Sequence, residues 1–168
     1  MTDKKRIWLS LGSNLGDRLG NLQRARMDLE SGGLKTIAQS SVYETAPWGY
    51  QSQNAFLNTC MVAETELVPY TVLTLLKSIE TILGRTDKGS GYADRSIDID
   101  ILFYGTDTIH QNGLQVPHPR IAERSFVLIP LAEIAPLYVH PVLKKTIKKL
   151  LLQCPDSGKV VRMDGLEW

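Results

Sequence analysis

Apolar residues in the first third of the chain recur at two spacings, and the change between them predicts the order of elements. Residues 7–11 form a short strand-like run that ends at Gly12-Ser13-Asn14. Asp17 is a residue type that often caps a helix, and Ser31-Gly32-Gly33 provides a stop. A helix is expected between them because leucines recur there at helical spacing: Leu15, Leu19, Leu22 and Leu29.

The following segments predict two strands and a second helix. Residues 34–44 and 56–65 are rich in β-branched and aromatic residues, and residues 45–50 between them contain Pro and Gly. Pro69 suits the first position of a helix, and Gly84 suits its end. The apolar face of this helix is formed by Val72, Leu75, Leu76, Ile79, Ile82 and Leu83.

Beyond residue 84 the pattern completes a recognisable order. Residues 85–95 are a charged, glycine-rich loop, residues 96–104 alternate as a strand, and residues 109–116 suggest a small hairpin. Residues 125–135 and 143–152 look helical. The order strand, helix, strand, strand, helix, strand is the split βαβ, ferredoxin-like pattern of an α+β protein. We expect one domain over residues 1–168, with an antiparallel sheet, helices on one face, a ligand groove on the other, and C-terminal helices.

Two acids in the strand at residues 96–104 carry the strongest chemical signal. Side chains alternate along a strand, so Ile97, Ile99, Ile101 and Phe103 are expected to enter the core from one face. Asp98 and Asp100 then share the opposite face, with α-carbons roughly 6.5–7 Å apart. Like charges this close repel unless a cation lies between them, and Mg²⁺ with bound phosphates suits such a pair. The alternative is a solvated face paired with Arg95 or Lys88.

Cationic residues surround this pair in the sequence. Arg85, Lys88 and Arg95 lie among glycines before the strand, and arginine binds phosphate oxygens in a bidentate manner. His118 and Arg124 follow the strand. Each group also has an alternative without a ligand. These alternatives are a loop that is simply solvated, a structural role for His118, and a solvated surface position for Arg124.

A second group of residues suits a flat heterocycle. Phe56 and Asn58 share a strand face, and Trp48 and Tyr50 lie in the loop before them. Aromatic rings would stack on the heterocycle and the amide would orient it. The alternative to a heterocycle site is that Phe56 belongs to the core and Trp48 only covers a surface.

Net charge, hydropathy and cysteine spacing limit the kinds of binding partner that the chain is expected to have. The formal net charge is +1, which gives no support for nucleic-acid binding, and no run of about 18 apolar residues predicts a membrane span. Cys60 and Cys154 show no Cys-x-x-Cys spacing, so two free buried thiols in a cytoplasmic protein are expected, and one disulfide is the alternative. We also expect a monomer. Phosphate-binding loops of the G-x-x-x-x-G-K-[ST] type and Gly-x-Gly-x-x-Gly fingerprints are absent, so any phosphate must be bound by metal and arginine.

Taken together, these segments resemble the dihydropterin pyrophosphokinases of folate synthesis. Two segments are specific in combination: Gly12-Ser13-Asn14 and Arg95-Ser96-Ile97-Asp98-Ile99-Asp100. Further matching segments occur in the same order over roughly residues 6–140, whereas residues 153–168 match nothing in the family: 41–45, 56–58, 79–85, 116–120 and 124–131.

The resemblance implies a function and a set of site residues. The family moves the pyrophosphoryl group of ATP onto 6-hydroxymethyl-7,8-dihydropterin, and two Mg²⁺ ions bound by Asp98 and Asp100 would bridge the ATP phosphates. The resemblance assigns ATP contacts to Lys77, Glu80, Arg85, Arg95, Ile101, His118 and Arg124, with Arg85, Lys88 and Arg95 also counted as catalytic. It assigns the pterin pocket to Thr45, Ala46, Trp48, Phe56, Asn58, Tyr92 and Phe126.

The chain departs from the family pattern in the loop before the acidic pair. The usual Gly-Pro-Arg is replaced by Ala93-Asp94-Arg95, and Asp87 with Lys88 stands where a second arginine is common. Lys88 would then replace that arginine.

Two other functions are compatible with the sequence. They are a non-catalytic ligand-binding module, which Mg²⁺-dependent ATP binding would argue against, and a phosphotransferase with another acceptor, which release of AMP would argue against.

Overall fold

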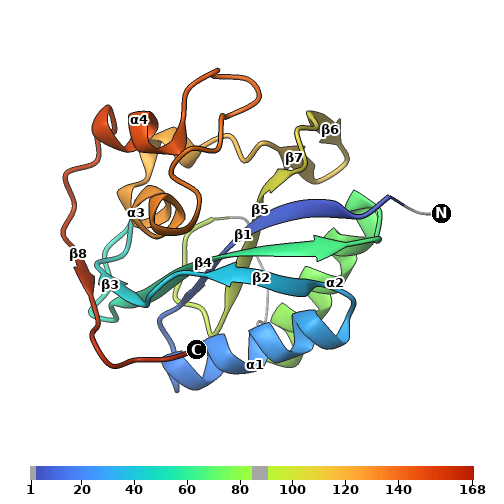
Figure 1. The fold of residues 1–168 in the computed structure, drawn as a ribbon. Helices are drawn as coiled ribbons and strands as arrows, with labels where there is room; N and C mark the ends of the chain where they lie inside the picture. The colour runs from blue at the N-terminus through green and yellow to red at the C-terminus, as the bar shows by residue number, and fades with distance from the viewer. Residues whose placement is uncertain (1–2, 85–90) are drawn as a thin grey trace.

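The computed structural model describes residues 3–84 and 91–168 and contains a mixed sheet-and-helix fold (Figure 1). In this part of the chain the main sheet has six strands in the order β5-β1-β4-β3-β8, with β2 also pairing with β4, and every pair is antiparallel. The strands are β1 (Lys5–Ser13), β2 (Lys35–Gln39), β3 (Tyr43–Thr45), β4 (Phe56–Thr65), β5 (Asp98–Tyr104) and β8 (Val160–Arg162). A separate hairpin is formed by β6 (Ile109–Gln111) and β7 (Leu114–Val116).

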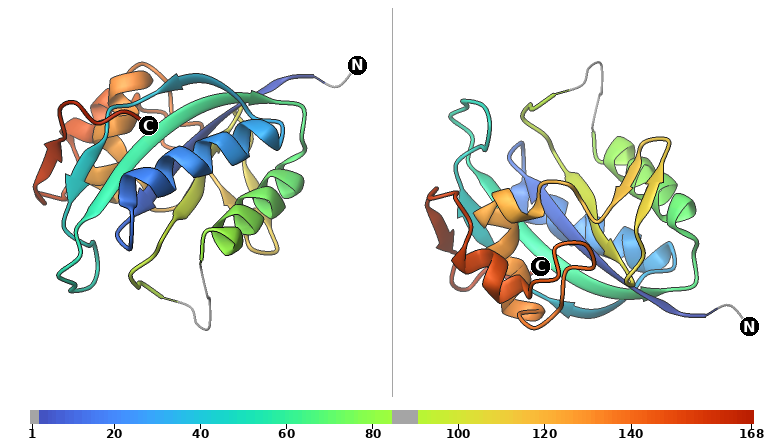
Figure 2. Two further views of the ribbon diagram at one scale, coloured as in Figure 1. Left: turned by 90° about the horizontal axis from the view of Figure 1, so that it is seen from below. Right: turned by 90° about the horizontal axis from the view of Figure 1, so that it is seen from above.

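Helices α1 (Arg18–Ser31) and α2 (Pro69–Ile82) lie side by side on one face of the sheet, as the left view of Figure 2 shows. Both begin where the sequence predicts. The Asp17 side chain caps α1 by accepting a hydrogen bond from the Gly20 N–H, and Pro69 occupies the first turn of α2. The main core lies between these helices and the sheet, and its β1 residues are Ile7, Leu9 and Leu11. The α+β, ferredoxin-like prediction is therefore confirmed.

Helices α3 (Ser125–Ile134) and α4 (Ile147–Leu152) cover part of the opposite face. They enclose a second core in which Trp8 and Phe103 of the sheet pack with Leu128 and Leu131 of α3 and Leu150 of α4. Burying these apolar side chains fixes α3 against the middle of the sheet. The ligand groove expected on this face is therefore confined to the part that α3 and α4 leave uncovered.

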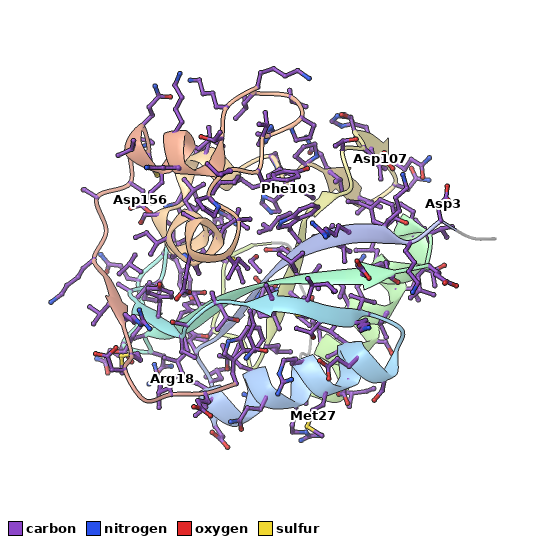
Figure 3. The ribbon with its side chains drawn as sticks, viewed as in Figure 1. Asp3, Arg18, Met27, Phe103, Asp107 and Asp156 are labelled. Carbon is purple, nitrogen blue, oxygen red and sulfur yellow. The ribbon has the colours of Figure 1, made fainter. Side chains whose placement is uncertain are left out.

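A β-bulge in β5 reverses the prediction made for Phe103. The β1 residue Trp8 pairs with Phe103, but the next residue Leu9 pairs with Ile101, so Leu102 is an extra residue in β5. The extra residue shifts the alternation, and Phe103 therefore lies on the face away from α1 and α2, as Figure 3 shows. The expectation that Phe103 shares a face with Ile97, Ile99 and Ile101 was wrong from the bulge onwards.

Three predicted boundaries also change. The strand expected over residues 34–44 is divided into β2 and β3, and Ser40 between them bonds to Cys60 of β4 through its backbone N–H and its hydroxyl oxygen. The strand expected from residue 96 begins at Asp98. The last helix begins at Ile147 because Thr146 caps it, accepting a hydrogen bond from the Lys149 N–H at 3.2 Å.

The C-terminal segment, which matched nothing in the sequence analysis, is part of the fold. β8 pairs with β3, and the Met163 N–H donates to the Val42 carbonyl oxygen at 2.8 Å. Trp168 is only 4% exposed, and its indole N–H donates to the Ser40 carbonyl oxygen at 2.8 Å. The segment therefore closes the edge of the sheet and the main core beside β2.

Both cysteines are free thiols, as expected, but only Cys60 is buried, whereas Cys154 is partly exposed. Within residues 3–84 and 91–168, none of the helices combines the length and apolar character needed to cross a bilayer.

The position of Trp168 leads to a stability prediction. Replacing Trp168 with Ala removes a buried indole from the main core, and we expect the free energy of unfolding to fall by about 3–5 kcal/mol. Urea denaturation followed by circular dichroism measures this change. The neighbouring Glu167→Ala substitution affects an exposed side chain and should change stability by no more than about 0.5 kcal/mol. Equal losses in the two variants would contradict the packing role of Trp168.

Candidate active site

A pocket of about 440 Å³ opens on the uncovered part of the second sheet face. Its floor is formed by β1, β4 and β5, and its walls by residues 45–50, by residues 91–95 and by the start of α3. The side chains predicted from the sequence that line this pocket are Thr45, Ala46, Trp48, Phe56, Asn58, Tyr92, Arg95, Asp98, Asp100, His118, Arg124 and Phe126.

Asp98 and Asp100 lie on the pocket face of β5, as the alternation predicted. Their side chains are 39% and 37% exposed, so both carboxylates are accessible from the pocket. Their neighbours on β1 are Gly12 opposite Asp98 and Ser10 opposite Asp100. Because these neighbours are small, the floor beside the two acids has room for a ligand.

The oxygen atoms of Asp98 and Asp100 are suitable ligands for a metal ion. Across the described ranges, no group of three or more His, Cys, Asp and Glu side chains forms a protein-only cage. Two carboxylates that leave other coordination positions open are what Mg²⁺ uses when it also binds substrate phosphates. The residues present therefore fit a magnesium site that phosphate oxygens complete.

Cationic and donor groups lie beside the acids. The Arg95 Nη1 atom is 3.8 Å from Asp98 Oδ1, and the His118 Nε2 atom is 4.0 Å from Asp100 Oδ2. Burial, with a further contribution from Arg124, lowers the pKa of His118 to about 4. His118 is therefore neutral at pH 7, and its contact with Asp100 is not an ion pair. Because His118 Nδ1 accepts the Arg120 N–H at 3.1 Å, the proton lies on Nε2, which can donate into the pocket.

Arg124 connects the acidic side of the pocket with the aromatic side. It is 9% exposed, and its Nε atom has no hydrogen-bond partner among the described residues. Its guanidinium carbon lies 4.7 Å from the centre of the Trp48 ring, and an Nη atom donates to the Tyr92 hydroxyl at 3.2 Å. A buried donor without a partner is costly, so this guanidinium is suited to receive an anionic ligand.

The aromatic side of the pocket has one orienting amide. Asn58 is buried and donates to the Thr45 hydroxyl at 2.7 Å, which fixes the direction of its amide. A β-carbon on Gly12 would lie 2.8 Å from Asn58 Oδ1, so only glycine fits beside this side chain. The Trp48 ring lies 5.7 Å from Tyr92 and 6.4 Å from Phe126, measured between ring centres. Trp48 meets Tyr92 edge-on, at 81°, so the rings form a wall of the pocket. The space beside this wall and the fixed amide could hold a flat ring, and we call it the aromatic slot.

Some predicted contacts do not lie at the pocket. Ile101 is buried in the main core beneath α1 and α2, so its side chain does not reach the pocket. Lys77 and Glu80 belong to α2 and are not among the lining residues, and Glu80 Oε1 accepts the Ile99 N–H at 3.4 Å. Arg85 and Lys88 lie outside the described residues.

Hydrogen bonds to Asp94 join the two loops of the pocket, residues 46–55 and residues 91–95, and the sequence analysis did not predict them. Asp94 accepts hydrogen bonds from four side chains, and the first contribution to its lowered pKa is the bond from Ser52. Burial, followed by the bond to Asp94, raises the pKa of Tyr50 to about 12, so this phenol remains a donor. The only signal in the sequence was that Asp94 departs from the Gly-Pro-Arg pattern.

Comparison with known proteins supports the family resemblance that the sequence suggested. Residues 8–136 match the family model described as 7,8-dihydro-6-hydroxymethylpterin-pyrophosphokinase. The chain is 42% identical over 138 residues to 2-amino-4-hydroxy-6-hydroxymethyldihydropteridine pyrophosphokinase of Porphyromonas gingivalis, covering 80% of this chain and 93% of the relative. Over 143 residues it is 39% identical to the protein of the same name from Aquifex aeolicus, covering 85% and 88%.

Longer proteins also contain a region like this chain. Folic acid synthesis protein FOL1 of Dictyostelium discoideum is 36% identical over 92% of this chain, which spans only 23% of that protein. The solved Plasmodium falciparum HPPK-DHPS wild-type structure matches with a TM-score of 0.72 at 19% identity, over 91% of this chain and 45% of its own, and supports the fold alone. From the family match and the shorter relatives, this chain belongs to the 7,8-dihydro-6-hydroxymethylpterin-pyrophosphokinase family, whose reaction is a pyrophosphoryl transfer of folate biosynthesis.

Proposed function

We propose that this chain transfers the pyrophosphoryl group of ATP to the hydroxymethyl oxygen of 6-hydroxymethyl-7,8-dihydropterin and releases AMP. The observation that supports this most directly is that one pocket contains both the acidic pair with its cationic neighbours and the aromatic slot with its amide. A polyphosphate and a flat heterocycle can therefore bind next to each other. We propose that the protein acts as a cytoplasmic monomer.

The phosphate side is assigned to Asp98 and Asp100. These carboxylates would hold two Mg²⁺ ions, which when bound supply positive charge beside the phosphoryl oxygens and orient them. Arg95 and Arg124 add fixed positive charge, and the neutral His118 donates a hydrogen bond through Nε2. Together they would stabilise the charge that develops on the phosphoryl group during transfer.

The pterin side orients the acceptor. Asn58, held by Thr45, would bond to the edge of the heterocycle, while Trp48, Tyr92 and Phe126 contact its faces. The hydroxymethyl oxygen then attacks the β-phosphorus of ATP as the bond from that phosphorus to the α,β-bridging oxygen breaks. AMP leaves with the bonding electrons, and the hydroxyl proton is released. No protein nucleophile is required in this in-line transfer.

The identity of the released nucleotide tests the proposed reaction. We expect AMP, and no ADP, in equimolar amount with the pterin diphosphate when the chain is mixed with ATP, Mg²⁺ and the pterin alcohol. Chromatography of the nucleotides measures this outcome. Omitting Mg²⁺ or the pterin should abolish AMP formation. Release of ADP would instead indicate transfer of a single phosphoryl group.

Removing either carboxylate of the acidic pair should stop turnover without unfolding the protein. We expect Asp98→Asn and Asp100→Asn each to lower kcat by about 10²- to 10³-fold, because a lost metal ligand removes several kcal/mol of charge stabilisation. Steady-state AMP release measures the rate, and circular dichroism checks the fold. Asp107→Asn, in the turn after β5, removes an acid away from the pocket and serves as the matched control. Turnover near that of the control in either variant would contradict the metal role.

The neutral state of His118 should be visible in the pH dependence of stability. The pKa of histidine is 6.5 when unfolded and about 4 for His118 in the fold, so the unfolded chain binds the proton first as pH falls. Wild-type protein should therefore lose up to about 3 kcal/mol from this site between pH 6.5 and pH 4. His118→Gln should lack this part of the loss, whereas His110→Gln, at an exposed position, should retain it. Urea denaturation across this pH range measures the difference, and parallel curves for the two variants would refute a neutral, half-buried His118.

A further inference from the structure

Asp94 is the centre of a hydrogen-bond network that joins the two loops of the pocket. Its Oδ1 accepts from Asn14 Nδ2 at 2.9 Å and from the Tyr50 hydroxyl at 2.9 Å. Its Oδ2 accepts from the Ser52 hydroxyl at 3.0 Å and from Asn54 Nδ2 at 2.7 Å. We call these five side chains the Asp94 network. One carboxylate thereby accepts hydrogen bonds from Asn14, directly after β1, and from three positions of residues 46–55.

The loop at residues 46–55 depends on this network for its position. It contains no helix or strand, yet it carries Trp48 at the wall of the pocket. Within the described part of the chain, the side-chain hydrogen bonds that connect residues 46–55 with other segments end on Asn14 or Asp94, apart from one that Arg18 donates to the Ala55 carbonyl oxygen at 3.0 Å. The Tyr50 ring also stacks parallel to Tyr92, with 6.4 Å between ring centres.

The same network reaches the phosphate side through Asn14. Asn14 is buried, its Oδ1 accepts the Arg95 N–H at 2.6 Å, and its own N–H donates to the Arg95 carbonyl oxygen at 3.0 Å. Asn14 therefore fixes both backbone groups of Arg95, whose guanidinium lies beside Asp98. The loop that carries Trp48 and the backbone that carries Arg95 are held by adjacent members of one network.

We propose that Asp94 is a positioning residue that holds residues 46–55 over the pocket before substrates arrive, so that the pterin slot is preformed. The proposal rests on the proposed function, since it assigns the slot to the pterin. Ordering a loop costs conformational entropy, and a loop that is already ordered does not incur that cost on binding. A chain with proline at this position, as is usual in the family, could not form this network, because the proline side chain has no hydrogen-bond acceptor.

Hydrogen exchange tests the network without any substrate. In Asp94→Ala we expect the backbone amides of residues 46–55 to exchange at least about fivefold faster than in the wild type, because several hydrogen bonds to a charged group are lost. Asp94→Asn keeps one carbonyl oxygen and should give an intermediate rate. Asp164→Ala removes an acid that is 91% exposed in the tail and should leave the exchange unchanged. Unchanged exchange in Asp94→Ala would overturn the proposal.

Steady-state kinetics then distinguishes positioning from general destabilisation. We expect the KM for the pterin to rise about tenfold in Asp94→Ala, which corresponds to 1.4 kcal/mol. The KM for ATP should change by no more than about twofold, because the two hydrogen bonds between Asn14 and the Arg95 backbone do not involve Asp94. Adding Tyr50→Phe to Asp94→Ala should raise the pterin KM less than Tyr50→Phe does alone, because the shared hydrogen bond is already absent. Equal rises in both KM values, or fully additive effects, would overturn the role. If the wild type releases no AMP, the proposed function fails, while the exchange experiment still decides whether Asp94 orders the loop.

Discussion

The alternation of side chains along β5, interrupted by one bulge, is the constraint on which the rest of the structure depends. Before the bulge, the pocket face of β5 carries Asp98 and Asp100; after it, the same face carries Phe103. One sheet face therefore has an acidic half and an apolar half. The apolar half packs against α3 and α4, and α3 begins immediately after Arg124. Packing in the second core thus places Arg124 and Phe126 at the edge of the pocket.

The pocket combines two chemical environments that are separated by only a few side chains. The acids, Arg95 and His118 suit phosphates and divalent cations, whereas Asn58 and the aromatic rings suit a flat ring. Arg124 belongs to both, since its guanidinium contacts the Trp48 ring and its Nε donor has no partner among residues 3–84 and 91–168. Two substrates bound in these environments would have their reacting atoms next to each other, so much of the proposed catalysis is positioning.

The end of β1 has a role that extends beyond its own strand. Gly12 leaves space for Asn58, while Asn14 fixes the Arg95 backbone and contacts Asp94. The Gly12-Ser13-Asn14 motif thereby connects the pterin slot, the acidic strand and the loop at residues 46–55. Three consecutive residues can do this because β1 lies between β4 and β5 in the sheet.

The sequence by itself determined the element order, the ferredoxin-like class and the shared face of Asp98 and Asp100, because spacing along one strand or helix is a local property. Resemblance assigned seven residues to the pterin pocket, four of them aromatic, and all seven line the pocket. Only the tertiary structure decided that Phe103 changes face, that Ile101 is buried away from the pocket and that Trp168 completes the core. It also decided that Asp94 meets Asn14, 80 positions away, and Tyr50, 44 positions away. Bulges and long-range hydrogen bonds depend on how strands pair, and no local pattern of residue types encodes that pairing.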